Sequence, residues 1–301
     1  MYDLAIIGGG PGAVAAGVYA ARKLLKTVFI TDTFGGQSIE SPEIQNWIGT
    51  EKISGIEFGK VLEAHLGAYG KDVLEIVKDD RVIVVSKESD GFSVKTDKHK
   101  TFSAKTVLVT SGGNRRRLTV PGADQFEQKG LTYCASCDGP LFSGMDVVVI
   151  GGGNAGFETA AQLLAYAKSV TVLQHRDAYS ADPVTIEKVL ANPIMHGILN
   201  AETTEIFGNK FVEGVRYKDL KTGEEHAIHA SGVFVEIGLV PSTDFIRELV
   251  EVDPYRRIIV DPKTQRTSVE GVWAAGDCTN GLYHQNNIAA GDAVKALEDI
   301  Y

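Results

Sequence analysis

Two cysteines separated by two residues form the segment of the chain best suited to chemistry. Cys134 and Cys137 lie in the sequence Cys-Ala-Ser-Cys-Asp, with Asp138 directly after the second cysteine. Such a pair can close a disulfide or contribute to a metal site. A tetrahedral metal site needs four ligands, whereas Cys278 is far away in sequence and no histidine stands near Cys134 at ligand spacing. We therefore interpret the pair as a redox dithiol without a metal; two structural cysteines in one loop are the simpler alternative.

A glycine-rich loop follows an apolar strand that we expect over residues 2–7, and precedes a helix expected over 15–22. Its pattern, Gly-x-Gly-x-x-Ala, is a dinucleotide-binding fingerprint, because the glycines allow a tight turn and let a pyrophosphate approach the backbone. A second strand expected over 27–32 ends on Asp32, at the position where an acid binds a ribose hydroxyl. The loop residues expected to bind this first dinucleotide are Gly8, Gly10, Pro11, Gly12 and Ala13.

The same fingerprint recurs after an apolar strand at residues 147–150, and it is followed by a helix expected over 157–167 and a strand over 169–173. Two fingerprints in one chain suggest two dinucleotides, one of which donates electrons to the other. A second site kept only as a scaffold is the alternative. The residues expected to bind a nicotinamide nucleotide here are Gly151, Gly153, Asn154, Gly156 and Glu158.

Two further apolar segments, 105–113 and 271–277, end on small residues. A strand that stops on glycine lets a cofactor lie against the backbone. We therefore expect Gly112 and Gly276 to contact the first dinucleotide. Asp277 follows such a stop, so its carboxylate can meet a sugar-like chain.

This order of motifs predicts an α/β fold of two Rossmann-like dinucleotide-binding domains, the second inserted into the first. The first domain is expected over 1–114 and again over 243–301, and the inserted domain, which carries the cysteine pair, over 115–242. Segments 117–122 and 238–242 each place a proline after an apolar step, which is typical of a semi-rigid linker.

The composition limits the classes of partner and location. The chain has 39 acidic and 30 basic residues and a net charge of -9, which argues against nucleic acid and anionic membrane as partners. Three cysteines are too few for a disulfide framework. No apolar run approaches the roughly twenty residues of a membrane span, and the first residues show no basic-then-apolar leader. We therefore expect a cytoplasmic enzyme.

Over essentially its whole length, the chain resembles the low-molecular-weight thioredoxin reductase family. The family orders an FAD domain, an inserted nicotinamide domain with Cys-x-x-Cys-Asp, and a return to the FAD domain; residues 134–139 match its active site. Arginine is usual in the family at position 284 and alanine at 286. The resemblance implies FAD contacts at Gly35, Gly36, Gln37, Asn46, His284, Gln285 and Asn286.

The resemblance also implies roles for the cysteines. Cys137 would lie against the flavin and accept electrons from it, and Cys134 would attack the disulfide of a thioredoxin-like protein. Asp138 is placed to give or take the proton of this exchange, with a helix cap or turn acid as the alternative. Cys278 is expected to be a buried small hydrophobe, and His284 either contacts the flavin edge or only packs. A homodimer is implied as well.

The sequence departs from the family at the second nucleotide site. Family members that use NADPH carry His-Arg-Arg-x-x-x-Arg, whereas residues 174–180 keep one arginine, Arg176, beside His175. A 2′-phosphate favours several bidentate cations. NADH would favour an acid at position 174, where this chain has Gln174. His175 and Arg176 remain the expected contacts, and both NADPH and NADH are weakly specified.

The leading interpretation is a flavin-dependent disulfide reductase that passes electrons through Cys134 and Cys137 to a thioredoxin-like protein. The first alternative is a relative without effective NAD(P)H use, either a ferredoxin-dependent thioredoxin reductase or a dithiol oxidase. A non-catalytic redox-sensing flavoprotein is less well matched, because a sensor has no need of Asp138. A ferredoxin–NADP reductase is disfavoured because it has no dithiol at this site. The flavoprotein of a peroxide-reducing system is disfavoured because it carries further N-terminal domains, which we expect this chain to lack.

Overall fold

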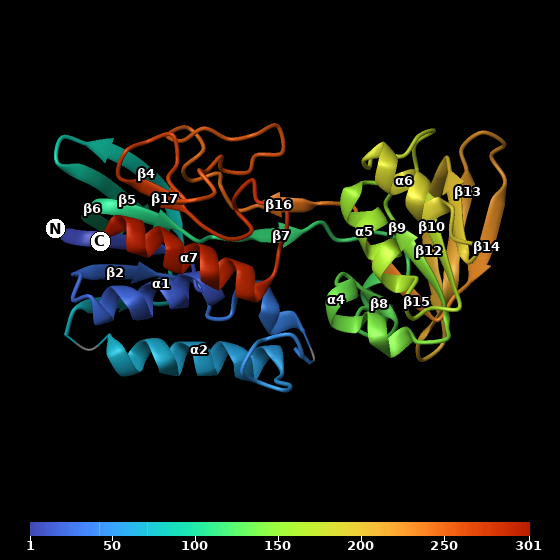
Figure 1. The fold of residues 1–301 in the computed structure, drawn as a ribbon, viewed down its shortest axis with the longest axis horizontal. Coiled ribbons are helices and arrows are strands. Elements are labelled where there is room, and N and C mark those ends of the chain that lie inside the picture. Colours follow the sequence, from blue (N-terminus) through green and yellow to red (C-terminus); the bar gives the residue numbers. More distant parts are fainter. Residues whose placement is uncertain (42, 71) are drawn as a thin grey trace. The chain divides into compact units, whose positions relative to one another are not determined.

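The chain folds into two compact units. A computed structural model describes residues 1–41, 43–70 and 72–301, with the backbone alone at Ser136 (Figure 1). Unit 1 comprises Met1–Asn114 and Val240–Tyr301, and unit 2 comprises Arg115–Leu239. The two crossing segments, β7 (Gly113–Arg115) and β16 (Leu239–Pro241), pair as a two-stranded sheet. The segment 117–122, which we expected to be a linker, therefore lies inside unit 2.

Unit 1 is built on a seven-stranded sheet. Its strands are β1 (Tyr2–Ile7), β2 (Thr27–Ile30), β3 (Leu74–Val77), β4 (Val82–Glu88), β5 (Gly91–Thr96), β6 (Thr101–Val109) and β17 (Val272–Ala274). Their order is β3-β2-β1-β6-β5-β4, and β17 also pairs with β6. The pairs β2–β3, β1–β2, β1–β6 and β6–β17 are parallel, whereas β4–β5 and β5–β6 are antiparallel. Leu4, Ala5 and Ile6 of β1 are fully buried, as expected for a parallel strand covered on both faces.

The helices of unit 1 pack closely because small residues lie where they contact one another. They are α1 (Pro11–Arg22), η1 (Gly36–Glu40), α2 (Gly55–Tyr69) and α7 (Asn286–Ile300). Figure 1 shows α1 beside α7, and α1 also contacts α2. A side chain on Gly17 of α1 would crowd Leu66 of α2, with 2.6 Å between its first carbon and Cδ1 of Leu66. Glycine at this position therefore lets α1 and α2 approach each other closely.

Unit 2 combines a parallel and an antiparallel sheet. The parallel strands are β8 (Leu131–Thr132), β9 (Asp146–Ile150), β10 (Ser169–Gln174), β11 (Met195–Leu199) and β15 (Gly232–Val235), in the order β11-β10-β9-β15-β8. The antiparallel strands, in the order β12-β13-β14, are β12 (Ala201–Gly208), β13 (Val212–Asp219) and β14 (Glu225–His229). The helices are α3 (Ala123–Phe126), α4 (Ala135–Asp138), η2 (Gly139–Phe142), α5 (Asn154–Leu163) and α6 (Pro183–Leu190).

The two units repeat one arrangement of parallel strands. The order β3-β2-β1-β6 of unit 1 corresponds to β11-β10-β9-β15 of unit 2, with a glycine loop and a helix after the central strand of each. The predicted α/β class with Rossmann-like domains is thus confirmed. The helix expected over 157–167 instead ends at Leu163, because the chain then turns into β10, with the Lys168 amide bonded to the Met145 carbonyl at 2.9 Å.

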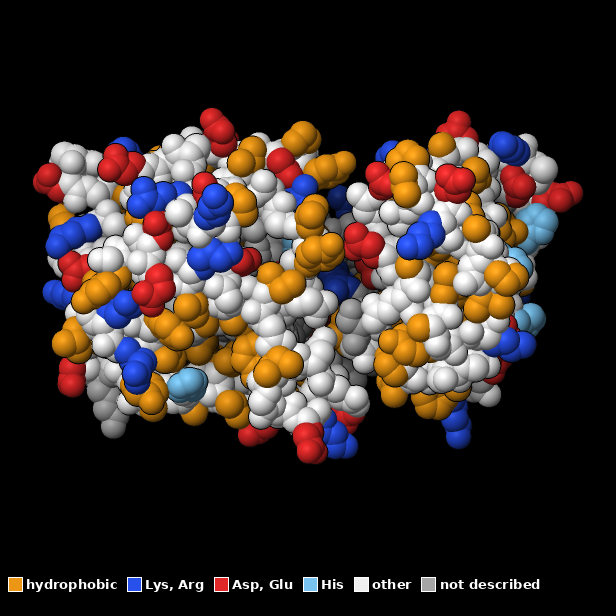
Figure 2. All heavy atoms as spheres, viewed as in Figure 1, with side chains coloured by type: hydrophobic (Ala, Val, Ile, Leu, Met, Phe, Trp, Pro, Cys, Tyr) orange, Lys and Arg blue, Asp and Glu red, His pale blue; other side chains and the backbone are white. Residues whose placement is uncertain are grey.

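Acidic and basic side chains are interspersed over the faces that Figure 2 shows. Several ion pairs are surface contacts of this kind, among them Lys105–Asp3 and Lys168–Asp146. None of the helices within the described ranges has the length and apolar character needed to cross a membrane.

Candidate active site

The cysteine pair forms a disulfide at the start of a one-turn helix. Cys134 and Cys137 are joined by their sulfurs, with 5.3 Å between the two Cα atoms. Cys134 is the N-cap of α4, and the backbone amide of Cys137 donates a hydrogen bond of 3.2 Å to Sγ of Cys134. A backbone amide aimed at a sulfur favours its thiolate form after reduction. The two-residue spacing therefore produces both the disulfide and a donor for one of its sulfurs.

Asp138 ends α4 and is held by a hydroxyl from the preceding strand. Thr132 donates a hydrogen bond to Oδ2 of Asp138, and Oγ1 of Thr132 accepts one of 3.3 Å from the Cys134 amide. Burial raises the pKa of Asp138, opposed by the Thr132 hydrogen bond and by the charge of Arg115. Asp138 also occupies the N-cap position of η2, as the alternative expected, although its side chain makes no capping hydrogen bond there.

The second glycine loop has the close contacts of a dinucleotide fingerprint. A side chain on Gly151, whose φ is +120°, would collide with the carbonyl oxygen of Glu236, and one on Gly156 would collide with the carbonyl oxygen of Gly151. Gly153 is the N-cap of α5, and Glu158 is exposed on that helix. The loop therefore has the backbone geometry with which a helix N-terminus can receive a phosphate.

The segment after β10 is tied to this loop. Gln174 is 3% exposed, and its Nε2 donates a hydrogen bond of 3.1 Å to the Ala178 carbonyl. The Ser180 amide donates one of 2.9 Å to the Gly152 carbonyl. Position 174, where a ribose-binding acid would stand, therefore holds a glutamine that stabilises the turn after β10.

Asn154, a predicted nicotinamide contact, has a local partner. Its Oδ1 accepts a hydrogen bond of 2.8 Å from the Asp182 amide, which fixes the end of the same segment. His175 and Arg176 are exposed at the turn, as is Asp177. One arginine beside one aspartate leaves this turn without the cluster of cations that a 2′-phosphate favours.

The first glycine loop leaves open space beside its backbone. Gly8 has a φ of +128°, and a side chain there would collide with the Thr110 carbonyl. By contrast, the first side-chain carbon of a residue at Gly10 would meet only Cα of Gly36, at 4.0 Å. Pro11 is the first residue of α1, where its missing amide costs no helical hydrogen bond. The space beside Gly10 therefore lies next to the free amides at the start of α1.

The same region is closed by the start of α7. The first carbon of a side chain at Gly12 would lie 3.0 Å from the Ala289 carbonyl, and at Gly276 it would lie 3.0 Å from Cβ of Ala289. Ala13 is fully buried. Gly112 has a φ of +64° and open space around it. The starts of α1 and α7, the glycine loop 8–12 and the turn at Gly276 thus meet where an anionic dinucleotide can bind.

Asp32, the predicted ribose ligand, is engaged by a cation. Oδ2 of Asp32 lies 2.8 Å from Nη2 of Arg81, and Oδ1 accepts a hydrogen bond of 2.9 Å from the Thr33 amide. The side chains of Asp32 and Arg81 are 48% and 71% exposed. An exposed pair of this kind contributes about 0–1 kcal/mol, so a ribose hydroxyl can replace Arg81 at little cost.

Several of the predicted flavin contacts gather around the N-terminus of α7. Three hydrogen bonds link the loops: Gln37 Nε2 to Asn114 Oδ1 at 3.4 Å, Asn46 Nδ2 to Gln285 Oε1 at 3.2 Å, and Ser38 Oγ to Asn286 Oδ1 at 2.9 Å. Gly35 and Gly36 both have positive φ, which lets η1 begin beside Gly10. Residues distant in sequence are therefore brought together at one edge of unit 1.

Asp277 and His284 face each other near this edge. Nδ1 of His284 lies 3.4 Å from Oδ1 of Asp277, and that nitrogen is buried with no hydrogen-bond partner within the described parts of the chain. Cys278, directly after Asp277, is fully buried, and desolvation raises the pKa of its thiol to about 11. Cys278 therefore has the environment of a buried hydrophobe, as expected.

We did not predict some residues of these sites from the sequence. Thr132 could have been suspected, because a hydroxyl two residues before the dithiol is within reach of Asp138. Arg81 lies 49 residues from Asp32, and Arg115 and Glu236 lie at opposite ends of unit 2 in the sequence. No local pattern joins such pairs.

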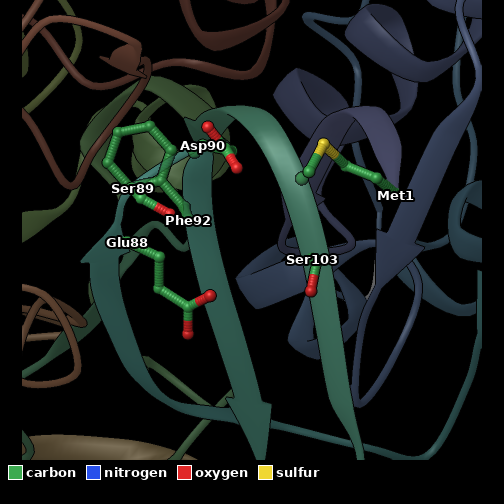
Figure 3. Close-up of a pocket in the computed structure, with 8 residues that line it drawn as sticks. Met1, Glu88, Ser89, Asp90, Phe92 and Ser103 are labelled. Atoms are coloured by element: carbon green, nitrogen blue, oxygen red, sulfur yellow. The ribbon is translucent and has the colours of Figure 1, made fainter.

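A pocket lies elsewhere in unit 1, lined by Met1, Glu88, Ser89, Asp90, Phe92 and Ser103 among others (Figure 3). None of the predicted site residues lines it. Within the described parts of the chain, no group of three or more histidine, cysteine, aspartate or glutamate side chains is placed to hold a metal ion.

The pyridine nucleotide-disulphide oxidoreductase family model matches residues 2–293. The thioredoxin reductase of Streptococcus pyogenes has a similar structure, with a TM-score of 0.89 and 33% identity over 100% of this chain and 97% of that one. A protein named NADH dehydrogenase from Bacillus subtilis is 39% identical over 295 residues, and the F subunit of the Escherichia coli alkyl hydroperoxide reductase is 39% identical over 296 residues. Each match covers 98% of this chain and 57% of the relative, so the chain spans little more than half the length of these curated relatives.

These similarities confirm the family resemblance that the sequence predicted. They do not test the role of any single residue. The assignments of flavin, nicotinamide and proton-transfer residues therefore stay predictions.

Proposed function

The chain belongs to the pyridine nucleotide-disulphide oxidoreductase family, and on that premise we propose that it is a flavin-dependent disulfide reductase acting on a thioredoxin-like protein. The observation that carries the proposal is the Cys134–Cys137 disulfide on α4, with Asp138 at the end of the same helical turn. Two redox sulfurs and one half-buried acid can together exchange a disulfide and its proton.

FAD is the cofactor of the family, and the residues of unit 1 fit it. The space beside Gly10 would receive the pyrophosphate, since a side chain there would enter that space. Gly12 and the start of α1 would supply backbone contacts, and Asp277 would contact the ribityl chain. Asp32 would release Arg81 to bind the ribose. When bound, FAD supplies the electron pair that reduces the disulfide.

The reduced dithiol would then act through its own residues. The Cys134 thiolate, stabilised by the Cys137 amide, attacks the partner disulfide; a mixed disulfide forms and one partner thiolate leaves. The Cys137 thiolate next attacks Sγ of Cys134, which restores the Cys134–Cys137 disulfide and releases the second partner sulfur. Asp138 donates a proton to a leaving thiolate and takes it back from a thiol in the next cycle.

A nicotinamide nucleotide is proposed as the donor, at the second glycine loop. A relative that is named NADH dehydrogenase supports this class of donor. The exposed turn with His175, Arg176 and Asp177 favours neither NADPH nor NADH. Weak use of both is therefore proposed, and a ferredoxin-type donor or oxidase activity is the alternative if neither reduces the flavin.

The acceptor needs its own test. The flavoproteins of peroxide-reducing systems were disfavoured from sequence, yet part of an alkyl hydroperoxide reductase shares 39% identity with this chain. The flavin and dithiol core alone does not separate the two classes, so a thiol-dependent peroxidase belongs beside thioredoxin in the assay. A homodimer and a cytoplasmic location stay predictions from the sequence.

The proposal is tested in two half-reactions. Anaerobic NADPH, NADH or reduced ferredoxin is mixed with the flavin-loaded chain, and loss of flavin absorbance identifies the donor. The reduced chain is then mixed with oxidised thioredoxin or an oxidised thiol-dependent peroxidase, and free thiols are counted. If the reduced chain transfers electrons to neither protein disulfide, the proposed function is wrong. Oxygen consumption without thiol formation would instead identify a dithiol oxidase.

A further inference from the structure

A buried acid outside the cysteine motif lies at the carboxyl edge of the parallel sheet of unit 2. Glu236 directly follows β15, and its side chain is 14% exposed. Thr159 of α5 donates a hydrogen bond of 2.8 Å to Oε1 of Glu236. Burial raises the pKa of Glu236, and the charge of Glu158 raises it further, against the opposing effects of Arg115 and Thr159. The disulfide-exchange chemistry described above makes no use of this acid.

The cation beside Glu236 is incompletely paired. Nη1 of Arg115 lies 4.0 Å from Oε1 of Glu236, which is too long for a hydrogen bond. That nitrogen is buried and has no hydrogen-bond partner among the described residues. A guanidinium in this position can attract more than one carboxylate, since its charge is not held by a bidentate pair.

The same guanidinium acts on Asp138. The charge of Arg115 lowers the pKa of Asp138 against the effect of burial. The helix that carries Asp138, α4, packs against α5, which carries the Thr159 hydroxyl that binds Glu236. The groups that act on the two carboxyls are therefore one shared cation, Arg115, one further acid, Glu158, and two hydroxyl donors, Thr132 and Thr159.

We propose that Arg115 and Glu236 are positioning residues for the proton step of the dithiol: Arg115 divides its charge between Glu236 and Asp138. This inference rests on the proposed function for its role in catalysis. While Glu236 is ionised, it draws on the charge of Arg115, and Asp138 keeps its proton to higher pH. When Glu236 is neutral, the full charge of Arg115 favours the Asp138 carboxylate.

The coupling between Arg115, Glu236 and Asp138 matters because Asp138 must act both as an acid and as a base during disulfide exchange. As an acid, Asp138 protonates the thiolate that leaves the partner disulfide; as a base, its carboxylate removes the proton from the Cys134 thiol. A carboxyl that performs both steps needs a pKa near the working pH. Burial favours the protonated form of Asp138, and the charge of Arg115 favours its carboxylate. A cation shared with Glu236 therefore sets the balance between these two effects.

Substitutions of Arg115 and of Glu236 distinguish this proposal from a purely structural role, because they should shift the pKa of Asp138 in opposite directions. Arg115→Met removes the cation and should raise the Asp138 pKa. Glu236→Gln keeps an acceptor for Thr159 but removes the competing charge, and should lower the Asp138 pKa. Each shift should be about half a unit to one unit, below the range for an exclusive charge pair. Arg116→Met, an equal charge change at the exposed neighbouring residue, is the matched control.

The Asp138 carboxyl is titrated by carbon-detected NMR in the full-length, flavin-loaded, oxidised chain, with its signal assigned by its loss in Asp138→Asn. Opposite shifts in the two variants and none in Arg116→Met support the proposal. Shifts of the same sign, or shifts in neither variant, overturn it. Thermal unfolding identifies a variant that does not fold. Arg115→Gln then replaces Arg115→Met, and Glu236→Ala replaces Glu236→Gln.

A second readout separates this inference from the proposed function. The rate at which each pre-reduced variant reduces a small aromatic disulfide is measured as a function of pH. The part of the pH–rate profile that is assigned to Asp138 should shift by the same amount as the pKa of the Asp138 carboxyl measured by NMR. If the carboxyl shifts appear but no variant reduces a disulfide, the proposed function fails while the charge coupling stands. If exchange proceeds and its pH profile ignores both substitutions, Arg115 and Glu236 have no part in the proton step.

Discussion

The backbone amide of Cys137 donates a hydrogen bond of 3.2 Å to Sγ of Cys134. The two redox sulfurs are therefore not equivalent, because the amide points to one of them and would stabilise its thiolate. This asymmetry agrees with Cys134 as the residue that attacks the partner disulfide and Cys137 as the residue that resolves the mixed disulfide.

Cys134→Ser should keep flavin binding and flavin reduction by the donor but lose reduction of the partner protein to the background rate. A serine oxygen cannot form the mixed disulfide. Stopped-flow absorbance follows the flavin, and a coupled thiol assay follows the partner. Cys278→Ser, which changes the buried free thiol of unit 1, serves as the control. Normal partner reduction by Cys134→Ser would refute the assigned roles.

Asp138→Asn should slow turnover by roughly ten- to a thousand-fold, the range expected when an acid–base group is lost. The amide retains the size of the carboxyl and can still accept the Thr132 hydrogen bond. The Michaelis constant for the partner should change little, because Asp138 acts on the proton and not on docking. Equal losses in binding and rate would point to a structural role.

The raised pKa of Asp138 also has a consequence for folding. A raised pKa in the folded chain means that the protonated carboxyl is the form that folding favours. Its stabilising contribution is present below the unfolded pKa of about 3.9 and is lost as pH rises through the folded pKa. Asp138→Asn stays neutral, so its stability relative to the wild type should increase as pH rises from 4 towards neutrality. Denaturant unfolding of both oxidised chains at several pH values measures this difference, and a constant difference would contradict it.

Gly10→Val should give a colourless protein, because the branched side chain would enter the space beside the start of α1 where the pyrophosphate is expected. The flavin absorbance of the purified chain measures the effect. Gly67→Ala is the matched control, since a side chain there meets open space on α2. A Gly10→Val protein that retains full flavin would contradict the assignment of this loop.

Wild-type chain should bind NADPH weakly and with little preference over NADH. Each absent charge-assisted hydrogen bond is worth about 1.5–3 kcal/mol, so two of them weaken binding by roughly two to four orders of magnitude. His175→Arg with Ser180→Arg should therefore tighten NADPH binding, while NADH binding stays constant. Calorimetric titration of both nucleotides distinguishes these outcomes. A low-micromolar Michaelis constant for NADPH in the wild type, with strong preference over NADH, is incompatible with this prediction.

Much of the fold could be predicted because its signals are local. The apolar strand before Gly8 and the one before Gly151 each run directly into a glycine turn and a helix, and these short segments define the two Rossmann-like repeats. The Cys-x-x-Cys-Asp segment is equally local. A dithiol, its N-cap sulfur and its acid all lie within five consecutive residues, 134–138.

The charges around the sites could not be predicted in this way. Asp32 fits the ribose position by spacing, but its pairing with Arg81 depends on a loop that follows β3. The inward turn of Gln174 depends on how the next five residues fold back on the glycine loop. Arg115 ends β7, and the pairing of β7 with β16 brings it near Glu236, which directly follows β15. Each of these contacts is set by tertiary packing, which leaves no periodic trace in the sequence.

The pairing of β7 with β16 bears on how such a molecule could have arisen. The chain leaves unit 1 and re-enters it through two adjacent, hydrogen-bonded strands, so the ends of the inserted segment are neighbours. A segment with adjacent ends can be spliced into a surface connection of a host without threading through it. The host sheet keeps its own strand order on both sides of the splice. A gene encoding one nucleotide-binding module could thus have acquired a second by a single recombination event.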